Sequence, residues 1–174
     1  VLDVVRRIAA VGIEDGLVFD PGTAVAVAIR DEDEYGGVRV TMPVTLSRAR
    51  IRFHVDVNVG DPIYPAPTVV DLPRLGGGTI ELLGYPLPMV LAEKIVTAVQ
   101  RGQSNTRWRD FADVYLLTCR HPIDGVELTE AIGAVAEYRQ AQLQPLSVLL
   151  AGFASYAQPR WVAWRRKQHL QDVL

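Results

Sequence analysis

A lysine lies on or beside the apolar stripe of a helix in the second half of the sequence. The stripe belongs to a helix expected from Pro88 to Arg101, and Lys94 follows Val90 and Leu91 by four and three positions. Two interpretations are open. Lys94 lies at the border of the stripe and extends its amine to water, or it points into a cleft and binds an anion such as a phosphate.

Two carboxylates recur at helical spacing shortly after this lysine. Asp110 and Asp113 share one face of a helix expected from Thr106 to Arg120. The helix dipole alone favours an acid in the first turn, which is a structural explanation for Asp110, but it explains Asp113 less well because Asp113 lies deeper in the helix. Arg107 and Arg109 come just before and could pair with these carboxylates or bind phosphate.

A further carboxylate, Asp56, lies on the polar face of an expected strand with Arg52, His54 and Asn58. A solvated strand face would explain all four residues. If that face instead lines a cleft, Asp56 is a carboxylate on a rigid strand and suits a divalent metal ion. His54 has no partner at metal-ligand spacing, so we expect it to be a surface histidine.

The elements that must position these residues come in the order strands, then helices. Residues 1–11 have apolar positions on one helical face, and Gly12 ends that helix. Strands are expected between Leu17 and Ile29. Alternating apolar and polar residues then predict an antiparallel hairpin of 38–46 and 51–59, joined by residues 47–50. Pro43 suggests that the first strand of this hairpin has an exposed edge over part of its length.

The rest of the chain changes from irregular to helical. Four prolines between residues 60 and 73 predict a stiff connection without regular structure, and a short strand is expected at 79–83. Four helices are expected after a hinge near Gly84-Tyr85-Pro86: 88–101, 106–120, 126–140 and 147–168. We therefore predict an α+β fold with a mixed or antiparallel sheet in residues 1–84 and a helical part in residues 85–174.

Other conspicuous segments of the sequence are weaker candidates for a functional site. Asp31-Glu32-Asp33 has the Asp-x-Asp form of metal-dependent phosphotransferases but lies in an acidic loop, so we expect it to be solvated. Gly76-Gly77-Gly78 lacks the Lys-Ser/Thr of a phosphate loop. We interpret Cys119 as a packing residue. Residues 161–167 mix tryptophan with Arg and Lys, and this segment is a nucleic-acid contact or, as we favour, a helix end whose cations complement the dipole.

Composition bounds the class of protein. The 174 residues, 49% of them hydrophobic and with one cysteine, are enough for a folded domain without disulfides. The apolar runs are shorter than a membrane span, and no signal peptide is evident, so we expect a cytoplasmic protein without a membrane contact. The net charge of -2 means that any nucleic-acid contact needs a local basic patch.

Three segments in order resemble a known family. They are 54–61 (HVDVNVGD), 91–95 (LAEKI) and 107–113 (RWRDFAD). Together they resemble the nucleotidyltransferase toxins of the AbiEii/AbiGii and MenT type, from type IV toxin–antitoxin systems, over about residues 1 to 117. The resemblance implies a fold similar to that of DNA polymerase β nucleotidyltransferases, Mg²⁺ as cofactor, a nucleoside triphosphate and a tRNA as substrates, and an antitoxin partner.

The same resemblance implies roles for single residues. Asp56 corresponds to a strand-borne carboxylate that places metal or activates the attacking hydroxyl. Lys94 corresponds to the lysine that contacts the triphosphate, and Asp110 and Asp113 to acidic residues of the catalytic site, with Arg107 and Arg109 near the substrates.

The sequence departs from the family pattern at its start. A Gly-Gly or Gly-Ser turn and a strand-borne Asp-x-Asp precede the first helix in the family, whereas this sequence begins within that helix at Val1, without Met. We therefore expect a shortened toxin homologue that does not transfer nucleotides by itself. The alternative is a non-catalytic binding module for an antitoxin, a nucleic acid or a full-length paralogue.

Overall fold

The computed structural model describes residues 1–30, 36–58, 62–74 and 76–173, and it divides into two compact units, 1–61 and 62–174. The acidic segment Asp31-Glu32-Asp33 lies outside the described residues, as does the 59–61 end of the first family segment. The predicted functional division after residue 84 stays a prediction.

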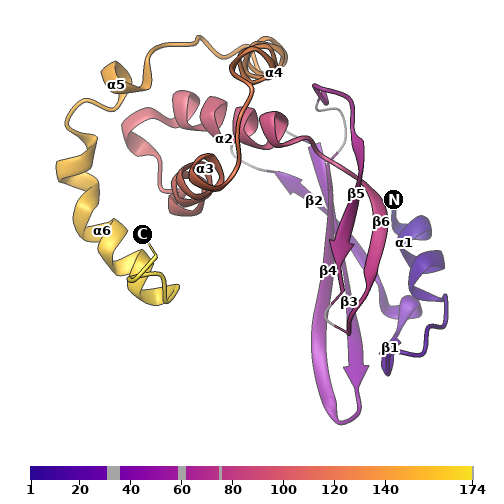
Figure 1. Cartoon of the computed structure of the whole chain (residues 1–174). Coiled ribbons are helices and arrows are strands. Elements are labelled where there is room, and N and C mark those ends of the chain that lie inside the picture. Colours follow the sequence, from indigo (N-terminus) through magenta and orange to yellow (C-terminus); the bar gives the residue numbers. More distant parts are fainter. Residues whose placement is uncertain (31–35, 59–61, 75, 174) are drawn as a thin grey trace. The chain divides into compact units, whose positions relative to one another are not determined.

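The first unit is one α-helix against a four-stranded antiparallel sheet (Figure 1). β3 is the central strand: β1 and β2 pair with one of its edges and β4 with the other. The elements are α1 (Leu2–Ala9), β1 (Leu17–Phe19), the short 3-10 helix η1 (Pro21–Thr23), β2 (Val25–Arg30), β3 (Gly36–Leu46) and β4 (Ala49–Asn58). The predicted first helix, early strands and hairpin are thus confirmed.

The β3–β4 hairpin is tighter than the sequence suggests. Leu46 pairs with Ala49, so only Ser47 and Arg48 form the loop, and Ser47 has a positive φ of 53°. The prediction of a four-residue loop was wrong because residues 49 and 50 join the strand. Hairpins with two-residue loops are common because their turn geometry matches the twist of the strands.

Pro43 lies where the partner of β3 changes. β1 pairs with residues 44–46 of β3 and β2 with residues 36–41, so Pro43 falls between the two. Its carbonyl accepts a hydrogen bond from the backbone N–H of Asp20 at 3.3 Å. The missing N–H of the proline thus falls at a break in the ladder, which agrees with the expected partly free edge.

The core of the first unit lies between α1 and the sheet. Val5 of α1 packs with Ala24, Val40 and Met42, all of them buried. β4 is more exposed than β3: its apolar Ile51 and Phe53 stay 45% and 36% exposed.

The second unit begins with a two-stranded sheet that the sequence predicted only in part. β5 (Thr68–Pro73) pairs with β6 (Thr79–Gly84), so the expectation of an irregular connection up to residue 73 was wrong over its last six residues. Val69, Val70 and Leu72 supply the β-branched and apolar residues of a strand. A Cβ at Gly84 would lie 2.7 Å from Cγ2 of Val70, so a larger residue here would force the Val70 side chain to shift.

Helices form the remainder of the second unit. They are α2 (Leu87–Arg101), the 3-10 helix η2 (Gly102–Ser104), α3 (Trp108–Arg120), α4 (Gly125–Tyr138), α5 (Leu146–Leu149) and α6 (Phe153–Lys167). Asp124 caps α4 by accepting hydrogen bonds from the backbone N–H groups of Val126 and Glu127. None of the described helices is both long and apolar enough to span a bilayer.

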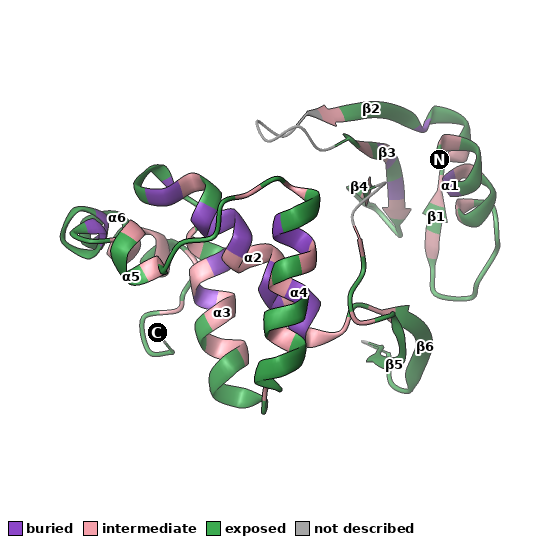
Figure 2. Cartoon of the chain, turned by 90° about the horizontal axis from the view of Figure 1, so that it is seen from above, coloured by how far each residue is buried: buried purple, intermediate pink, exposed green. Residues whose placement is uncertain are grey.

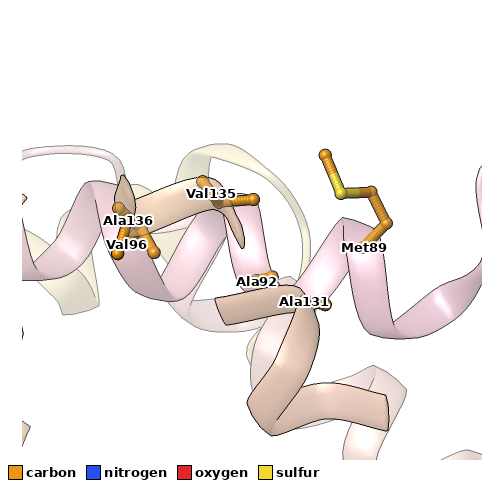
Figure 3. Packing of buried hydrophobic residues seen from close by; sticks show 6 residues of the cluster. All are labelled: Met89, Ala92, Val96, Ala131, Val135 and Ala136. Atoms are coloured by element: carbon orange, nitrogen blue, oxygen red, sulfur yellow. The ribbon is translucent and has the colours of Figure 1, made fainter. Parts of the chain in front are cut away.

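The main core of this unit joins α2 and α4. Its members are Met89, Ala92, Val96, Ala131, Val135 and Ala136 (Figure 3). Small residues face each other across the contact, which lets the two helices approach closely. Figure 2 shows the buried residues gathered on the helices, whereas β5 and β6 are exposed.

Two further predictions need correction. The single helix expected from 147 to 168 is two helices, because Gly152 adopts the left-handed conformation with φ 78° between α5 and α6. Cys119 is exposed rather than packed. The strands-then-helices order and the α+β class are confirmed.

Candidate functional site

The second unit brings three of the predicted site residues into direct contact. Helix α2 buries Leu91, Ala92 and Val96, and Lys94 extends from the same helix towards α3. Nζ of Lys94 donates to Oδ1 of Asp110 and to Oδ2 of Asp113, each at 2.8 Å. Lys94, Asp110 and Asp113, to which the family resemblance gives roles in catalysis, thus lie in direct contact.

The exposure of these side chains decides between the two interpretations of Lys94. Only 19% of the lysine side chain is exposed, with 11% for Asp110 and 36% for Asp113. The amine therefore does not extend into water as a stripe-border lysine would. It is held between two carboxylates at the junction of α2 and α3.

The loop before α3 adds a second cation. Nε of Arg107 lies 2.7 Å from Oδ2 of Asp110, so each oxygen of this carboxylate has a cationic partner. Oδ1 of the buried Asn105 accepts a hydrogen bond of 2.8 Å from the backbone N–H of Arg107 and fixes the start of the helix. Arg109 is exposed, and among the described residues no ion pair involves it.

The charges of this cluster, which we call the Lys94 cluster (Lys94, Arg107, Asp110 and Asp113), cancel formally. Burial, the largest single effect, would lower the pKa of Lys94, but the hydrogen bonds and charges of Asp110 and Asp113 together outweigh it and raise that pKa above its ordinary value. Lys94 is therefore an ammonium at neutral pH. Because the cluster is already neutral, an added polyanion would have to compete with the two carboxylates.

The ammonium nevertheless keeps a donor for a ligand. It has three N–H groups, of which the two carboxylates use two, and in the described part of the chain the third has no partner. Lys94 and Asp110 line a pocket of about 300 Å³ together with Asn105, Tyr115 and Thr118. A phosphate oxygen is a fitting acceptor for this third N–H, with the carboxylates holding the amine in place.

Asp56 lies in the first unit and has a partner that the sequence analysis missed. It pairs in register with Arg39 of β3, whose Nε and Nη2 each lie 2.6 Å from one of its carboxylate oxygens. This hydrogen bonding, ahead of the charge attraction, lowers the pKa of Asp56 below its ordinary value. The two side chains stay 43% and 48% exposed, so the pair is solvated.

These residues meet only part of the requirements of a magnesium site. Among the residues that the structure describes, no three His, Cys, Asp or Glu side chains form a group that could hold a metal ion. Asp56 offers one exposed carboxylate, and Mg²⁺ is commonly held by one or two carboxylates plus substrate phosphates and water. Asp56 therefore fits as a single protein ligand, provided that Arg39 gives up at least one oxygen.

Fold and site together define an α+β protein of the nucleotidyltransferase-like class, with a sheet first and the charged cluster on consecutive helices afterwards. The family model of the nucleotidyl transferase AbiEii toxin, type IV toxin–antitoxin system, matches residues 1–172, and the chain belongs to this family. No match was found among the curated proteins or the solved structures. The chain is thus a nucleotidyltransferase-like toxin homologue from a family of toxin–antitoxin systems.

Proposed function

We propose that the chain binds the phosphates of a nucleoside triphosphate at Lys94, for transfer of a nucleotide to an RNA acceptor such as tRNA in the cytoplasm. The observation that carries the proposal is the third N–H of Lys94, which faces no described partner while the ammonium is held by two carboxylates. Family membership supports the reaction class. An antitoxin is the regulatory partner that this family implies.

The residues of the Lys94 cluster have different roles in this proposal. Lys94 donates to a phosphate oxygen and neutralises charge that develops on the leaving pyrophosphate. Asp110 and Asp113 are positioning residues, because they hold the ammonium rather than touch the nucleotide. Arg107 orients Asp110, and the exposed Arg109 adds a cation near the substrates.

We further propose Mg²⁺ as the cofactor, with Asp56 as its ligand in this chain. When bound, the ion would offset phosphate charge and favour attack by the acceptor hydroxyl. Arg39 controls whether Asp56 is available, because it now occupies both carboxylate oxygens.

A second candidate function is a binding module without transfer activity. It is favoured by the absence of a three-residue metal-ligating group from the described ranges 1–30, 36–58, 62–74 and 76–173. Such a module would still use the Lys94 cluster to bind a nucleotide or a polyanion.

Nucleotide binding and nucleotide transfer, measured on the same preparations, separate these functions. Binding of labelled nucleoside triphosphates is compared for the unmodified chain, Lys94→Met and Arg120→Met, the last removing an exposed cation from the end of α3. We expect Lys94→Met to abolish binding and Arg120→Met to leave it unchanged. Equal binding by the chain and Lys94→Met would contradict both functions.

Transfer is then tested with tRNA and Mg²⁺. Label incorporation that is lost in Asp56→Ala would establish transfer and overturn the expectation that the chain by itself is inactive. Binding that depends on Lys94 without incorporation would establish the binding module.

A further inference from the structure

An aromatic pocket lies between α3 and α6 in the second unit. Its volume is about 480 Å³, within the range of small-ligand sites. Trp108, Phe111 and Tyr115 of α3 line it together with Phe153 and Trp161 of α6. Lys94 and Asp110 do not line this aromatic pocket but a smaller one, which shares Phe111 and Tyr115 with it.

Several rings of the lining pack on one another in pairs. The rings of Trp108 and Phe153 are stacked with centroids 6.1 Å apart and planes inclined by 23°, and Phe111 lies 5.8 Å from Phe153. Trp161 stacks on Trp164 at 5.1 Å and 19°. Tyr115 at the rim is 58% exposed. The lining of the pocket is thus formed largely by aromatic rings, against which a flat ligand can pack.

The charged residues of α6, on one side of the pocket, all have the same sign, whereas α3 carries Asp110 and Asp113. Helix α6 contains no acidic residue but carries Arg160, Arg165, Arg166 and Lys167, in a chain whose net charge is -2. The guanidinium of Arg165 lies 5.9 Å from the ring centre of Trp161, and that of Arg160 lies 4.5 Å from the ring centre of Tyr156. Complementing the helix dipole explains cations in the last turn, but it explains neither Arg160 nor the aromatic pocket.

Flat rings with flanking cations match one kind of ligand better than others. Nucleic-acid bases stack on aromatic side chains independently of the nucleotide sequence, while Arg and Lys bind the phosphates of a single strand. An apolar protein segment would fill the pocket but would make no use of the positive charge of α6. We propose that the α3–α6 pocket binds unpaired nucleotides of an RNA strand, with bases against Trp108 and Trp161 and phosphates along α6. The choice of RNA as the nucleic acid rests on the proposed function, whereas the binding of a single strand at this pocket does not.

Intrinsic fluorescence reports directly on this surface, because all three tryptophans of the chain lie on α3 and α6. A single-stranded RNA of about ten nucleotides, unlabelled, is titrated into the full chain. We expect tryptophan quenching that saturates, and much weaker quenching by the same sequence in a duplex. Quenching by mononucleotides alone, or equal binding of strand and duplex, would overturn the proposal.

Variants assign binding to the two halves of the surface, with a fluorescein-labelled RNA and anisotropy as the readout. Trp161→Leu and the milder Tyr115→Ala should each weaken binding about tenfold, whereas Tyr138→Ala, an exposed aromatic at the end of α4, should not. Removing the exposed Arg166 and Lys167 should lower the salt dependence of binding, with Arg74→Ala as the matched control. A folded Tyr115→Ala with unchanged affinity would contradict the pocket.

Lys94→Met separates this inference from the proposed function. Strand binding should survive in that variant, because Lys94 does not line the α3–α6 pocket. If RNA binding is lost in a folded Lys94→Met variant but kept in Trp161→Leu, whose side chain lines only the aromatic pocket, the strand binds at the Lys94 cluster and the inference is wrong. If the chain binds an apolar, acidic peptide at this pocket and no RNA, the surface is a protein-docking site instead.

Discussion

The two units each hold a carboxylate against a cation, yet the surroundings differ. In the second unit Asp110 is 11% exposed and has two cationic partners, one on each oxygen. In the first unit Asp56 has one partner, Arg39, and 43% of its side chain is exposed. The same type of contact therefore carries a large desolvation cost in one place and a small one in the other.

This difference indicates which of the two contacts has a function besides stabilising the fold. A cross-strand pair such as Arg39–Asp56 follows from strand register on a wet face and needs no further explanation. Four ionised groups at a helix junction are expensive, because apolar residues of similar volume often serve stability as well or better. The Lys94 cluster is therefore the stronger candidate for a functional site, and four predictions test the contrast.

The largest effect is expected from removing the central cation. Lys94→Met keeps the length of the side chain but leaves Asp110 and Asp113 close together, with Arg107 as the remaining partner. The free energy of unfolding should fall by about 3 kcal/mol, measured by urea denaturation, because breaking a buried ion pair leaves an uncompensated charge. Arg120→Met, on exposed surface, should change it by less than about 0.5 kcal/mol. If both variants lost similarly little free energy of unfolding, the Lys94 cluster would contribute no more than an exposed charge. The contrast between the two units would then disappear.

The two carboxylates of the cluster should differ from each other. Asp110→Asn removes a nearly buried charge with two partners, so a loss of about 2 kcal/mol in the free energy of unfolding is expected. Asp113→Asn removes a carboxylate that is 36% exposed, so about 1 kcal/mol is expected. The same denaturation series measures both, with Glu127→Gln at the exposed start of α4 as control. The reverse order would show that exposure does not govern the cluster.

The raised pKa of Lys94 gives a prediction in pH. In the unfolded chain the ammonium titrates near 10.5, and in the folded chain at a higher pH, because the two carboxylates outweigh the effect of burial. Its contribution to stability is therefore complete below about pH 10.5 and is lost as the pH rises through the folded value. The stability gap between the unmodified chain and Lys94→Met should narrow on going from about pH 8 to about pH 12. A gap that is constant over this range would contradict the ionic origin of the stability.

The carboxylates and the lysine of the Lys94 cluster could be identified from the sequence. The period of 3.6 residues placed Asp110 and Asp113 on one face, and the interruption of an apolar stripe marked Lys94. Periodicity describes each helix alone, however, and says nothing of which face of α3 meets α2. The family resemblance assigned the three residues to one catalytic site, and the structure supplies the contact and its distances.

The Arg39–Asp56 pair in the sheet could not be predicted from the sequence, because the predicted length of the hairpin turn was wrong. A four-residue loop at 47–50 would pair Leu46 with Ile51 and set Asp56 opposite Thr41. The two-residue loop at Ser47 and Arg48 shifts the register and sets Asp56 opposite Arg39. Nothing in the period-two pattern distinguishes these registers, since a shift of two residues keeps every side chain on its face.

The remaining misses have local causes. β5 was not predicted because four prolines between residues 60 and 73 suggested an irregular segment. The residues of β5 nevertheless suit a strand, and its one proline, Pro73, lies at the strand end. The glycine between α5 and α6 was passed over because the apolar pattern continues on both sides of it. A left-handed φ at Gly152 is a backbone property that hydrophobic periodicity does not detect.

The smallest effect is expected from the exposed pair. Arg39→Ala, Asp56→Ala and the double variant form a cycle whose coupling should be well below the loss in Lys94→Met, and smaller still in about 1 M salt, where charges are screened within about 3 Å. The pKa of Asp56 is lowered, so its contribution is present above the ordinary value of 3.8 and is lost as the pH falls through the lower folded value. At neutral pH the contribution is therefore complete.

The outcome bears on the proposed metal ligand as well as on stability. A weak, salt-sensitive coupling means that Arg39 releases Asp56 at little cost, as a carboxylate that also binds Mg²⁺ requires. A coupling as large as the loss in Lys94→Met, unchanged by salt, would make Asp56 a fixed structural group. In that case Arg39→Ala should be the only background in which Asp56 affects the Mg²⁺ dependence of nucleotide binding, and the division of roles between the two units would have to be redrawn.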